Sequence, residues 1–210
     1  SAVCVTGLAS VDPSGTFTTF GEMVLIALVQ IGGLGFMTFG VLIAMLLGKR
    51  LGLKERLIIQ ESTKSASIQG LVRLSLNIFM IALLFEGAGA VILTLHWASE
   101  FGPAKAAYYG VFHAISAFNN GGFALWPDSL MRYAGDPVVN FVISFLFIIG
   151  GIGFTVLMDL YRKRRWSLLS LNTKIVLLAS TLLSVSGFLV LFILESLNPL
   201  PVQMSLGERL

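Results

Sequence analysis

Two short polar stretches interrupt an otherwise apolar sequence, and they carry the residues whose types and spacing could do chemistry. They read SAVCVTGLAS at Ser1–Ser10 and SAFNNGGFAL at Ser116–Leu125. Laid over each other, both begin with serine and alanine and place a glycine seventh, so that Gly7 and Gly122 are 115 residues apart. Glycine accepts unusual backbone angles and leaves no side chain in the way of a passing ion. Backbone carbonyl oxygens beside such glycines can replace the water shell of a cation, which predicts a cation selectivity filter.

The segments around these stretches are typical of an integral membrane protein. Of the 210 residues, 56% are hydrophobic and only 12% are charged, whereas about a quarter of the residues in a soluble domain are charged. Four apolar segments exceed the roughly 20 residues that cross a bilayer. A further amphipathic run, about residues 104–118, is too short to cross and predicts a re-entrant half-helix. The four expected spans are about residues 18–47, 71–97, 138–161 and 171–197.

The basic residues predict how the chain is oriented in the membrane. Lysines and arginines gather after the first and third spans and are sparse on the other side, and the positive-inside rule places the richer side in the cytoplasm. Both polar stretches then lie on the outer side. The net charge of +3 does not indicate nucleic-acid binding, because the basic residues cluster at span ends. The richer side holds Lys49, Arg50, Lys54, Arg56, Lys64, Arg73, Arg162, Lys163, Arg164, Arg165 and Lys174, and the other side holds Lys105, Arg132 and Arg209.

A second pair of matching stretches extends the internal repeat. The run IGGLGF at Ile31–Phe36 is matched 118 residues later by IGGIGF at Ile149–Phe154. Because each unit contains two spans and one re-entrant loop, the copies are parallel and related by an axis along the membrane normal. A pore is expected on that axis. The glycines in these runs are interpreted either as helix-packing residues or as a hinge or pore wall.

Three further features have both a functional and a structural interpretation. Glu86 lies near the middle of the second span, where a carboxylate is energetically expensive; it is either a functional residue or a hydrogen-bond partner of a neighbouring helix or loop. His113, inside the short helix, either supports the site or only braces that helix. The basic clusters either meet anionic lipid headgroups or dock a cytoplasmic protein. The only cysteine, Cys4, excludes an internal disulfide.

The stretches SAVCVTGL, QIGGLGFMTFG, FHAISAFNNGGFAL and IIGGIGF together resemble the Trk/Ktr/HKT superfamily of potassium transporters. The likeness is greatest to the membrane-embedded, sodium-dependent Ktr-type subunit of bacteria, and it covers essentially the whole chain. It implies an all-α membrane protein with four helix–pore-loop–helix repeats around a central ion pore. This chain, expected to be a fragment of a longer protein, would hold about half of them.

The resemblance also implies boundaries for the repeats. The filter and inner helix of repeat one would occupy residues 1–50, followed by a cytoplasmic linker at 51–70. Repeat two would occupy 71–165, and the outer helix and start of the outer loop of repeat three would occupy 166–210. Within repeat two, the pore helix is expected at about 104–118, the filter at about 119–122 and the inner helix at about 138–161.

The filter residues follow from the resemblance position by position. Its glycines would be Gly7 and Gly122, and glycine at the first filter position accompanies potassium preference in the family. Carbonyl groups of the preceding residues would line the ion path, with His113 and Glu86 as support. The potassium-binding residues are thus expected to be Val3, Cys4, Val5, Thr6, Gly7, Phe118, Asn119, Asn120, Gly121 and Gly122.

The expected function is passive potassium uptake across a bacterial plasma membrane, without enzyme chemistry. The resemblance implies a lipid environment, a homodimer and a ring of cytoplasmic nucleotide-binding regulatory subunits, with sodium as a candidate activating ion and no organic cofactor or nucleic acid. A sodium or mixed sodium and potassium transporter of the same fold is the main alternative. An intramembrane enzyme and a non-conducting scaffold are others; against the enzyme, the sequence has no HExxH or GxSxG motif.

Overall fold

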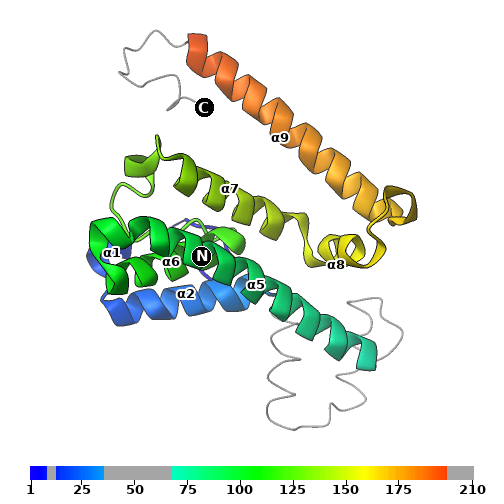
Figure 1. The fold of residues 1–210 in the computed structure, drawn as a ribbon, viewed down its shortest axis with the longest axis horizontal. Helices are drawn as coiled ribbons and strands as arrows, with labels where there is room; N and C mark the ends of the chain where they lie inside the picture. Colours follow the sequence, from blue (N-terminus) through cyan, green and yellow to red (C-terminus); the bar gives the residue numbers. More distant parts are fainter. Residues whose placement is uncertain (9–12, 36–67, 198–210) are drawn as a thin grey trace.

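The computed structural model describes residues 1–8, 13–35 and 68–197, and within these ranges every regular element is a helix (Figure 1). No strand occurs in the described ranges, so the predicted all-helical class is confirmed for them. The helices are α1 (Pro13–Thr16), α2 (Thr19–Gly33), α5 (Ile68–Phe101), α6 (Pro103–Phe118), α7 (Pro137–Ile152), α8 (Phe154–Lys163) and α9 (Leu171–Leu197), with short 3₁₀ turns η1 (Met131–Tyr133) and η2 (Trp166–Leu168).

Two of these helices are long and apolar enough to cross a bilayer on their own. They are the segment Leu76–Phe101 of α5 and the segment Leu171–Leu194 of α9. Nearly all large side chains of α9 are exposed, as expected for a helix whose neighbours are lipid tails or other membrane helices. Helix α2 is apolar but shorter. The remainder of the first expected span, from residue 36 onward, lies outside the described residues, as do most of the linker at 51–70 and the end of the chain from 198.

The third expected span, about residues 138–161, is not one helix. It divides into α7 and α8, which meet at an angle of 92° on either side of Gly153. Gly153 has φ +93°, a conformation that other residues rarely adopt, so the break is located at the residue that tolerates it best. The sequence predicts one continuous span here, but it leaves a hinge at this glycine run open beside helix packing, and the break agrees with the hinge.

The short helix α6 is held between the longer ones, and its C-terminal end lies inside the bundle. It folds back against α5 directly after Gly102 and also packs against α7 and α2 (Figure 1). Its end is buried by Phe118, whose ring stacks on Phe85 of α5 with centroids 6.2 Å apart. Leu93 of α5 and Leu146 of α7 are buried in the same core. A half-helix with a buried end presents its last carbonyl groups to the interior of the molecule.

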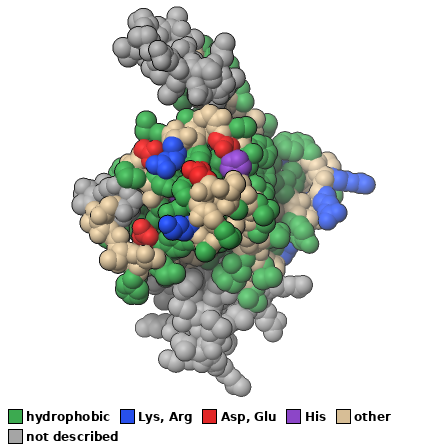
Figure 2. Space-filling model, turned by 60° about the vertical axis from the view of Figure 1, so that its left-hand side comes forward, with side chains coloured by type: hydrophobic (Ala, Val, Ile, Leu, Met, Phe, Trp, Pro, Cys, Tyr) green, Lys and Arg blue, Asp and Glu red, His purple; other side chains and the backbone are tan. Residues whose placement is uncertain are grey.

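A cluster of packed aromatic rings lies between α5, α6 and η1. Trp97 of α5 packs edge-on against Trp126, with ring centroids 5.2 Å apart, and Trp126 stacks on His113 at 4.4 Å. Tyr133 of η1 contacts both tryptophans. With this part of the molecule turned forward, Figure 2 shows charged side chains gathered on the surface among hydrophobic ones. The cluster separates that polar surface from the end of α6.

Capping carboxylates fix the ends of α7 and α9. Asp136 precedes α7 and accepts hydrogen bonds from the backbone N–H groups of Val138 (2.9 Å) and Val139 (3.2 Å). Its second oxygen lies 2.6 Å from Nε2 of His96 on α5. Asp159 of α8 accepts hydrogen bonds from the N–H of Ser170 and the hydroxyl of Thr173, both at 2.8 Å, where α9 begins. The Asp136 contact thus joins α5 to the start of α7, 40 residues apart, and the Asp159 contacts join the consecutive helices α8 and α9.

Candidate functional site

The two polar stretches adopt the same backbone conformation at equivalent positions. Gly7 and Gly122 both have φ +69°. Two positions earlier, Val5 has φ +51° and Asn120 has φ +58°, although neither is a glycine. A left-handed conformation at a β-branched valine is rare, so its occurrence at the position equivalent to Asn120 indicates a shared loop geometry.

The backbone hydrogen bonds of the two stretches also repeat with the same offset of 115 residues. In each loop, two successive N–H groups turn back to carbonyl groups of the preceding residues. A repeated hydrogen-bond pattern of this kind defines one loop structure used twice. The bonds are Val5 N–Ala2 O (3.1 Å) and Thr6 N–Ser1 O (3.2 Å) in the first loop, and Asn120 N–Ala117 O (3.0 Å) and Gly121 N–Ser116 O (2.7 Å) in the second.

The two loops lie against each other, glycine to glycine. A Cβ atom added to Gly7 would lie 2.7 Å from the carbonyl oxygen of Gly121 and 3.4 Å from Cα of Gly122. A Cβ atom added to Gly122 would lie 3.5 Å from Cα of Gly7. The structure therefore brings together the two glycines that the sequence placed in equivalent positions, and the packing leaves no room for a side chain at Gly7.

Glycines of the two runs IGGLGF and IGGIGF pack directly against the backbone of the loops. A side chain at Gly32 would collide with the carbonyl oxygen of Val3, and a side chain at Gly150 would collide with that of Phe118. These are again equivalent pairs, one in each repeat. The glycines therefore allow α2 and α7 to approach the loops closely, which is a more specific role than helix-to-helix packing. The last glycines of the two runs, Gly35 and Gly153, both have positive φ.

The electrostatics of the second loop favour a cation. Helix α6 ends at Phe118, and the C-terminal end of a helix carries about half a negative charge. Residues Asn119–Gly122 continue directly from that end, so their carbonyl groups lie in the same negative field. Among the described residues, no cluster of three His, Cys, Asp or Glu side chains could hold a metal ion. The negative field of the helix end would favour a cation near these backbone oxygens.

His113 and Ser116 brace the chain that leaves the second loop. The Ser116 hydroxyl donates to the carbonyl oxygen of Phe123 (2.8 Å) and accepts from its N–H (2.9 Å). His113 donates from Nδ1 to the Tyr109 carbonyl (2.7 Å), which leaves Nε2 to accept from the N–H of Leu125 (3.4 Å). These partners favour the bracing interpretation of His113. Ser116 was not singled out from the sequence, although its equivalence with Ser1 was visible there.

Glu86 is buried, and its carboxylate contacts the side chain of Asn119 in the second loop. Its oxygens accept hydrogen bonds from Nε2 of Gln30 (3.0 Å) and Nδ2 of Asn119 (2.9 Å). Sequence reasoning missed Gln30. The signal for it was an amide side chain in an apolar helix, immediately before IGGLGF.

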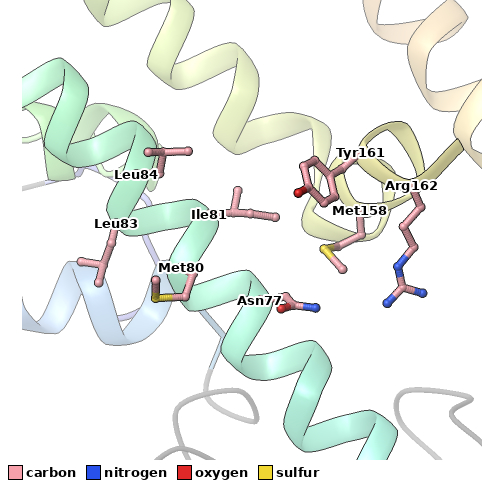
Figure 3. A pocket seen from close by; sticks show the side chains of 8 residues that line it. All are labelled: Asn77, Met80, Ile81, Leu83, Leu84, Met158, Tyr161 and Arg162. Atoms are coloured by element: carbon pink, nitrogen blue, oxygen red, sulfur yellow. The ribbon is translucent and has the colours of Figure 1, made fainter. Parts of the chain in front are cut away.

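A pocket of about 870 Å³ between α5 and α8 lies apart from the loops (Figure 3). In Figure 3, Asn77 and Ile81 of α5 face Met158, Tyr161 and Arg162 of α8 across an open space. No residue of the two glycine loops lines it, so it is not part of the candidate site. Its lining residues are Asn77, Met80, Ile81, Leu83, Leu84, Met158, Tyr161 and Arg162.

The sequence profile of the TrkH family, described as cation transport proteins, matches residues 1–205. The chain belongs to this family. The predicted superfamily is thereby confirmed. Individual proteins of known name are also similar to the chain. The chain is 51% identical over 199 residues to the Ktr system potassium uptake protein B of Bacillus subtilis, covering 95% of this chain and 45% of that protein.

Two further TrkH-family relatives carry similar names. The chain is 41% identical over 201 residues to the Ktr system potassium uptake protein B of Vibrio alginolyticus, covering 95% of this chain and 44% of that protein. It is 33% identical over 210 residues to the potassium/sodium uptake protein NtpJ of Enterococcus hirae, covering 100% of this chain and 47% of that protein. The chain thus spans about half the length of the curated relatives it matches. All three are named as uptake proteins, which fits the expectation of a transporter without enzyme chemistry.

Proposed function

We propose that the protein takes up potassium ions across the plasma membrane through a pore whose selectivity filter consists of backbone carbonyl oxygens. The ion exchanges its water shell for these oxygens and moves down its electrochemical gradient. A potential that is negative inside contributes about 2.3 kcal/mol per charge per 100 mV. In this chain the filter residues are Val3, Cys4, Val5, Thr6 and Gly7 of the first loop, and Phe118, Asn119, Asn120, Gly121 and Gly122 of the second.

One observation carries this proposal: two loops of equal conformation meet at Gly7 and Gly122. Equal φ values and equal hydrogen bonds at a fixed offset support two copies of one helix–pore-loop–helix unit. Their contact supports an axis shared by both copies, as expected for parallel repeats around one pore. The complete protein would have four such repeats, of which this chain holds about half.

The proposed orientation and partners follow from the charges and the relatives. The basic loops face the cytoplasm of a bacterial cell, and the glycine loops open to the outside. Two such proteins form a dimer on a ring of cytoplasmic nucleotide-binding subunits, to which the basic loops dock. Sodium is an activating ion. The names of two relatives, each called protein B of a Ktr system, support a protein that works as one component of several.

Growth of a potassium-uptake-deficient bacterium at low external potassium tests the proposed function. The complete gene is expected to restore growth, and the variant Gly122→Asp, which places a carboxylate in the ion path, is expected not to. Membrane levels of the two proteins are compared by immunoblot. Normal growth of the Gly122→Asp strain would contradict the filter assignment.

A second candidate function is transport of sodium, or of both ions, through the same pore. The relative named as a potassium/sodium uptake protein favours it. The discriminating variant is Gly7→Ser, whose side chain would meet the carbonyl oxygen of Gly121 and so shift the two loops against each other. If the filter selects potassium, this variant raises sodium permeation; if the native filter already passes sodium, ion preference changes little.

A further inference from the structure

A buried network of three polar side chains lies behind the second glycine loop. Nδ2 of Asn119, which has two hydrogens to share, lies 2.9 Å from each of three acceptors: Oε1 of Glu86, Oε1 of Gln30 and the carbonyl oxygen of Ile115. Gln30 donates in turn to Oε2 of Glu86 (3.0 Å). The three side chains thus form a closed ring of hydrogen bonds. They come from three elements, namely α2, α5 and the loop after α6.

The network connects the two repeats. Gln30 belongs to the helix that follows the first loop, whereas Asn119 belongs to the second loop, and the two are 89 residues apart in sequence. Glu86 lies on α5, which precedes α6. A movement of Asn119 therefore changes contacts with both neighbours, and the second loop is held relative to the first repeat by side chains as well as by glycine contacts.

The network has no equivalent in the first repeat. The position equivalent to Asn119 is Cys4, which is exposed, and the position equivalent to Gln30 is Ile148. Neither side chain can reproduce an amide-to-carboxylate hydrogen bond. Within the described residues, a buried carboxylate therefore contacts the second loop through an amide that the first loop does not have.

The environment of the network makes its geometry rigid. Glu86 is 4% exposed and Asn119 is 7% exposed. On its other side the Asn119 side chain packs directly against Gly33, where any side chain would collide with it. A buried carboxylate is costly unless its hydrogen bonds are made, so loss of one partner affects the others. The Oδ1 atom of Asn119 has no hydrogen-bond partner and lies against Gly33, so Asn119 is held by the bonds of Nδ2 on one side and by close packing on the other.

We propose that Glu86 and Gln30 are positioning residues that fix Asn119 and, through it, the carbonyl oxygens of Asn119–Gly122 that face the ion. Neither residue touches the ion in this account. Ion selectivity then depends on Glu86, because a loop free to shift can adjust its oxygens to a smaller ion. This inference depends on the proposed function, since it assigns a supporting role within the same filter.

The test compares Glu86→Gln with wild type and with Glu100→Gln. Both variants replace a glutamate of α5 by its amide, but Glu100 lies at the far end of the helix, next to Tyr133. Uptake of potassium and of sodium is measured in cells expressing the complete gene, with apparent KM and maximal rate for each ion. For Glu86→Gln we expect the potassium-over-sodium preference to fall about tenfold and the KM for potassium to rise, because a hydrogen bond to a buried charge is lost. Glu100→Gln is expected to match wild type.

A change in selectivity distinguishes positioning from a contribution to folding alone. If Glu86 only stabilised the fold, fewer molecules would be active; the maximal rate would fall while KM and ion preference stayed constant. The double variant Gln30→Glu with Glu86→Gln returns one carboxylate to the network from α2 and is expected to recover most of the lost preference. If Glu86→Gln does not accumulate in the membrane, Gln30→Ala, which leaves Glu86 and Asn119 bonded, is measured in its place.

The possible outcomes separate the inference from the function on which it depends. A normal KM and a normal ion preference in Glu86→Gln would overturn the positioning role. If Gln30→Ala has to be measured instead, the same result in that variant would overturn it. Failure of the double variant to recover any ion preference would also count against it. If wild type itself took up no potassium, the proposed function would be wrong, and that result is read from wild type alone.

Discussion

At the scale of single residues, the site depends on the absence of side chains at four glycines. Gly7 and Gly122 allow the loops to touch, and Gly32 and Gly150 allow the following helices to approach the loops. At Gly7, Gly32 and Gly150 an added methyl group would collide with a backbone carbonyl oxygen, which cannot rotate away as a side chain can, so small additions there should move the loops themselves. At Gly122 the nearest atom lies 3.5 Å away, and the positive φ is what disfavours a side chain.

Gly32→Ala and Gly150→Ala are expected to reduce potassium uptake about tenfold or more at equal protein level. The added methyl group would collide with the carbonyl oxygen of Val3 or Phe118, and overpacking of this kind costs about 1–3 kcal/mol. The matched control is Gly187→Ala in α9, where no atom lies within 4 Å of the added group. Radioactive rubidium uptake in cells measures the effect. Equal uptake by all three variants would contradict the close packing of these glycines against the loops.

At the scale of helices, the break between α7 and α8 depends on Gly153. Its φ of +93° and ψ of +141° lie in a region that residues other than glycine occupy at a cost of about 1–3 kcal/mol. Because no atom lies within 4 Å of its Cβ position, the strain is conformational and not steric. Gly35 has φ +82° at the equivalent position, so the positive φ itself is repeated.

Gly153→Ala is therefore expected to destabilise the protein and to favour a straighter helix. The unfolding midpoint of purified protein in detergent should fall, while Gly187→Ala should leave it unchanged or raise it, since alanine is the better helix former. Spin labels on Asn140 and Tyr161 would report the angle between α7 and α8. An unchanged midpoint together with an unchanged distance between labels would contradict the assignment of the bend to Gly153.

The start of α7 provides a second test at this scale. Asp136→Ala removes the hydrogen bonds to Val138 and Val139 and the contact with His96, and loss of such a cap costs about 0.5–2 kcal/mol. Asp136→Asn, which can still accept from the N–H groups, is the control and should lose less. A midpoint for Asp136→Ala equal to that of wild type would show that the cap is dispensable.

The same carboxylate predicts a dependence on pH. Burial raises the pKa of Asp136, but the hydrogen bonds from His96 and the two backbone N–H groups outweigh it, and the pKa lies below its ordinary value of 3.8. A carboxylate with a lowered pKa stabilises the folded state at neutral pH. That contribution is lost as the pH falls below 3.8 toward the folded-state pKa. In thermal unfolding, wild type and Asp136→Ala should therefore converge in stability as the pH falls through that range.

Comparison of sequence and structure shows which features local patterns encode. The long apolar run of α9 and the amphipathic run of α6 predicted those helices, because membrane depth fixes the length of a span. The equivalence of Gly7 and Gly122 was visible as a repeat. For the glycine runs the sequence left a hinge and helix packing open, and neither the choice between them nor the 92° angle could be read from it. A hydrogen bond from Glu86 to a neighbouring helix or loop was one of the two predicted roles, but its partners Gln30 and Asn119 were not predicted, because only tertiary structure brings residues so distant in sequence together.

At the scale of the whole molecule, the apolar helices fit a membrane protein, and the distribution of charges is the basis of the proposed orientation. The large side chains of α9 are exposed, and basic residues follow α8. The glycine loops and η1 belong to the side that is poor in basic residues. In our proposal, that side faces outward and Arg162–Arg165 face the cytoplasm.

Cysteine labelling of intact cells tests this orientation. Met131→Cys in η1 is expected to react with a membrane-impermeant thiol reagent, whereas Ser167→Cys in η2 is expected to react only after the cells are opened. Both positions are exposed, so access to the reagent and not burial decides the result. The native Cys4 is first replaced by serine to remove its own signal. Labelling of Ser167→Cys in intact cells would reverse the proposed topology.

The central claim is that the two glycine loops face one ion path, and potassium flux into proteoliposomes tests it most directly. The purified complete protein is compared with Gly7→Asp and Gly122→Asp, each shown to be folded by its elution from size-exclusion chromatography. Because both carboxylates would enter the same path, we predict that each variant alone abolishes potassium flux. Flux at the wild-type rate in either variant would contradict a shared path.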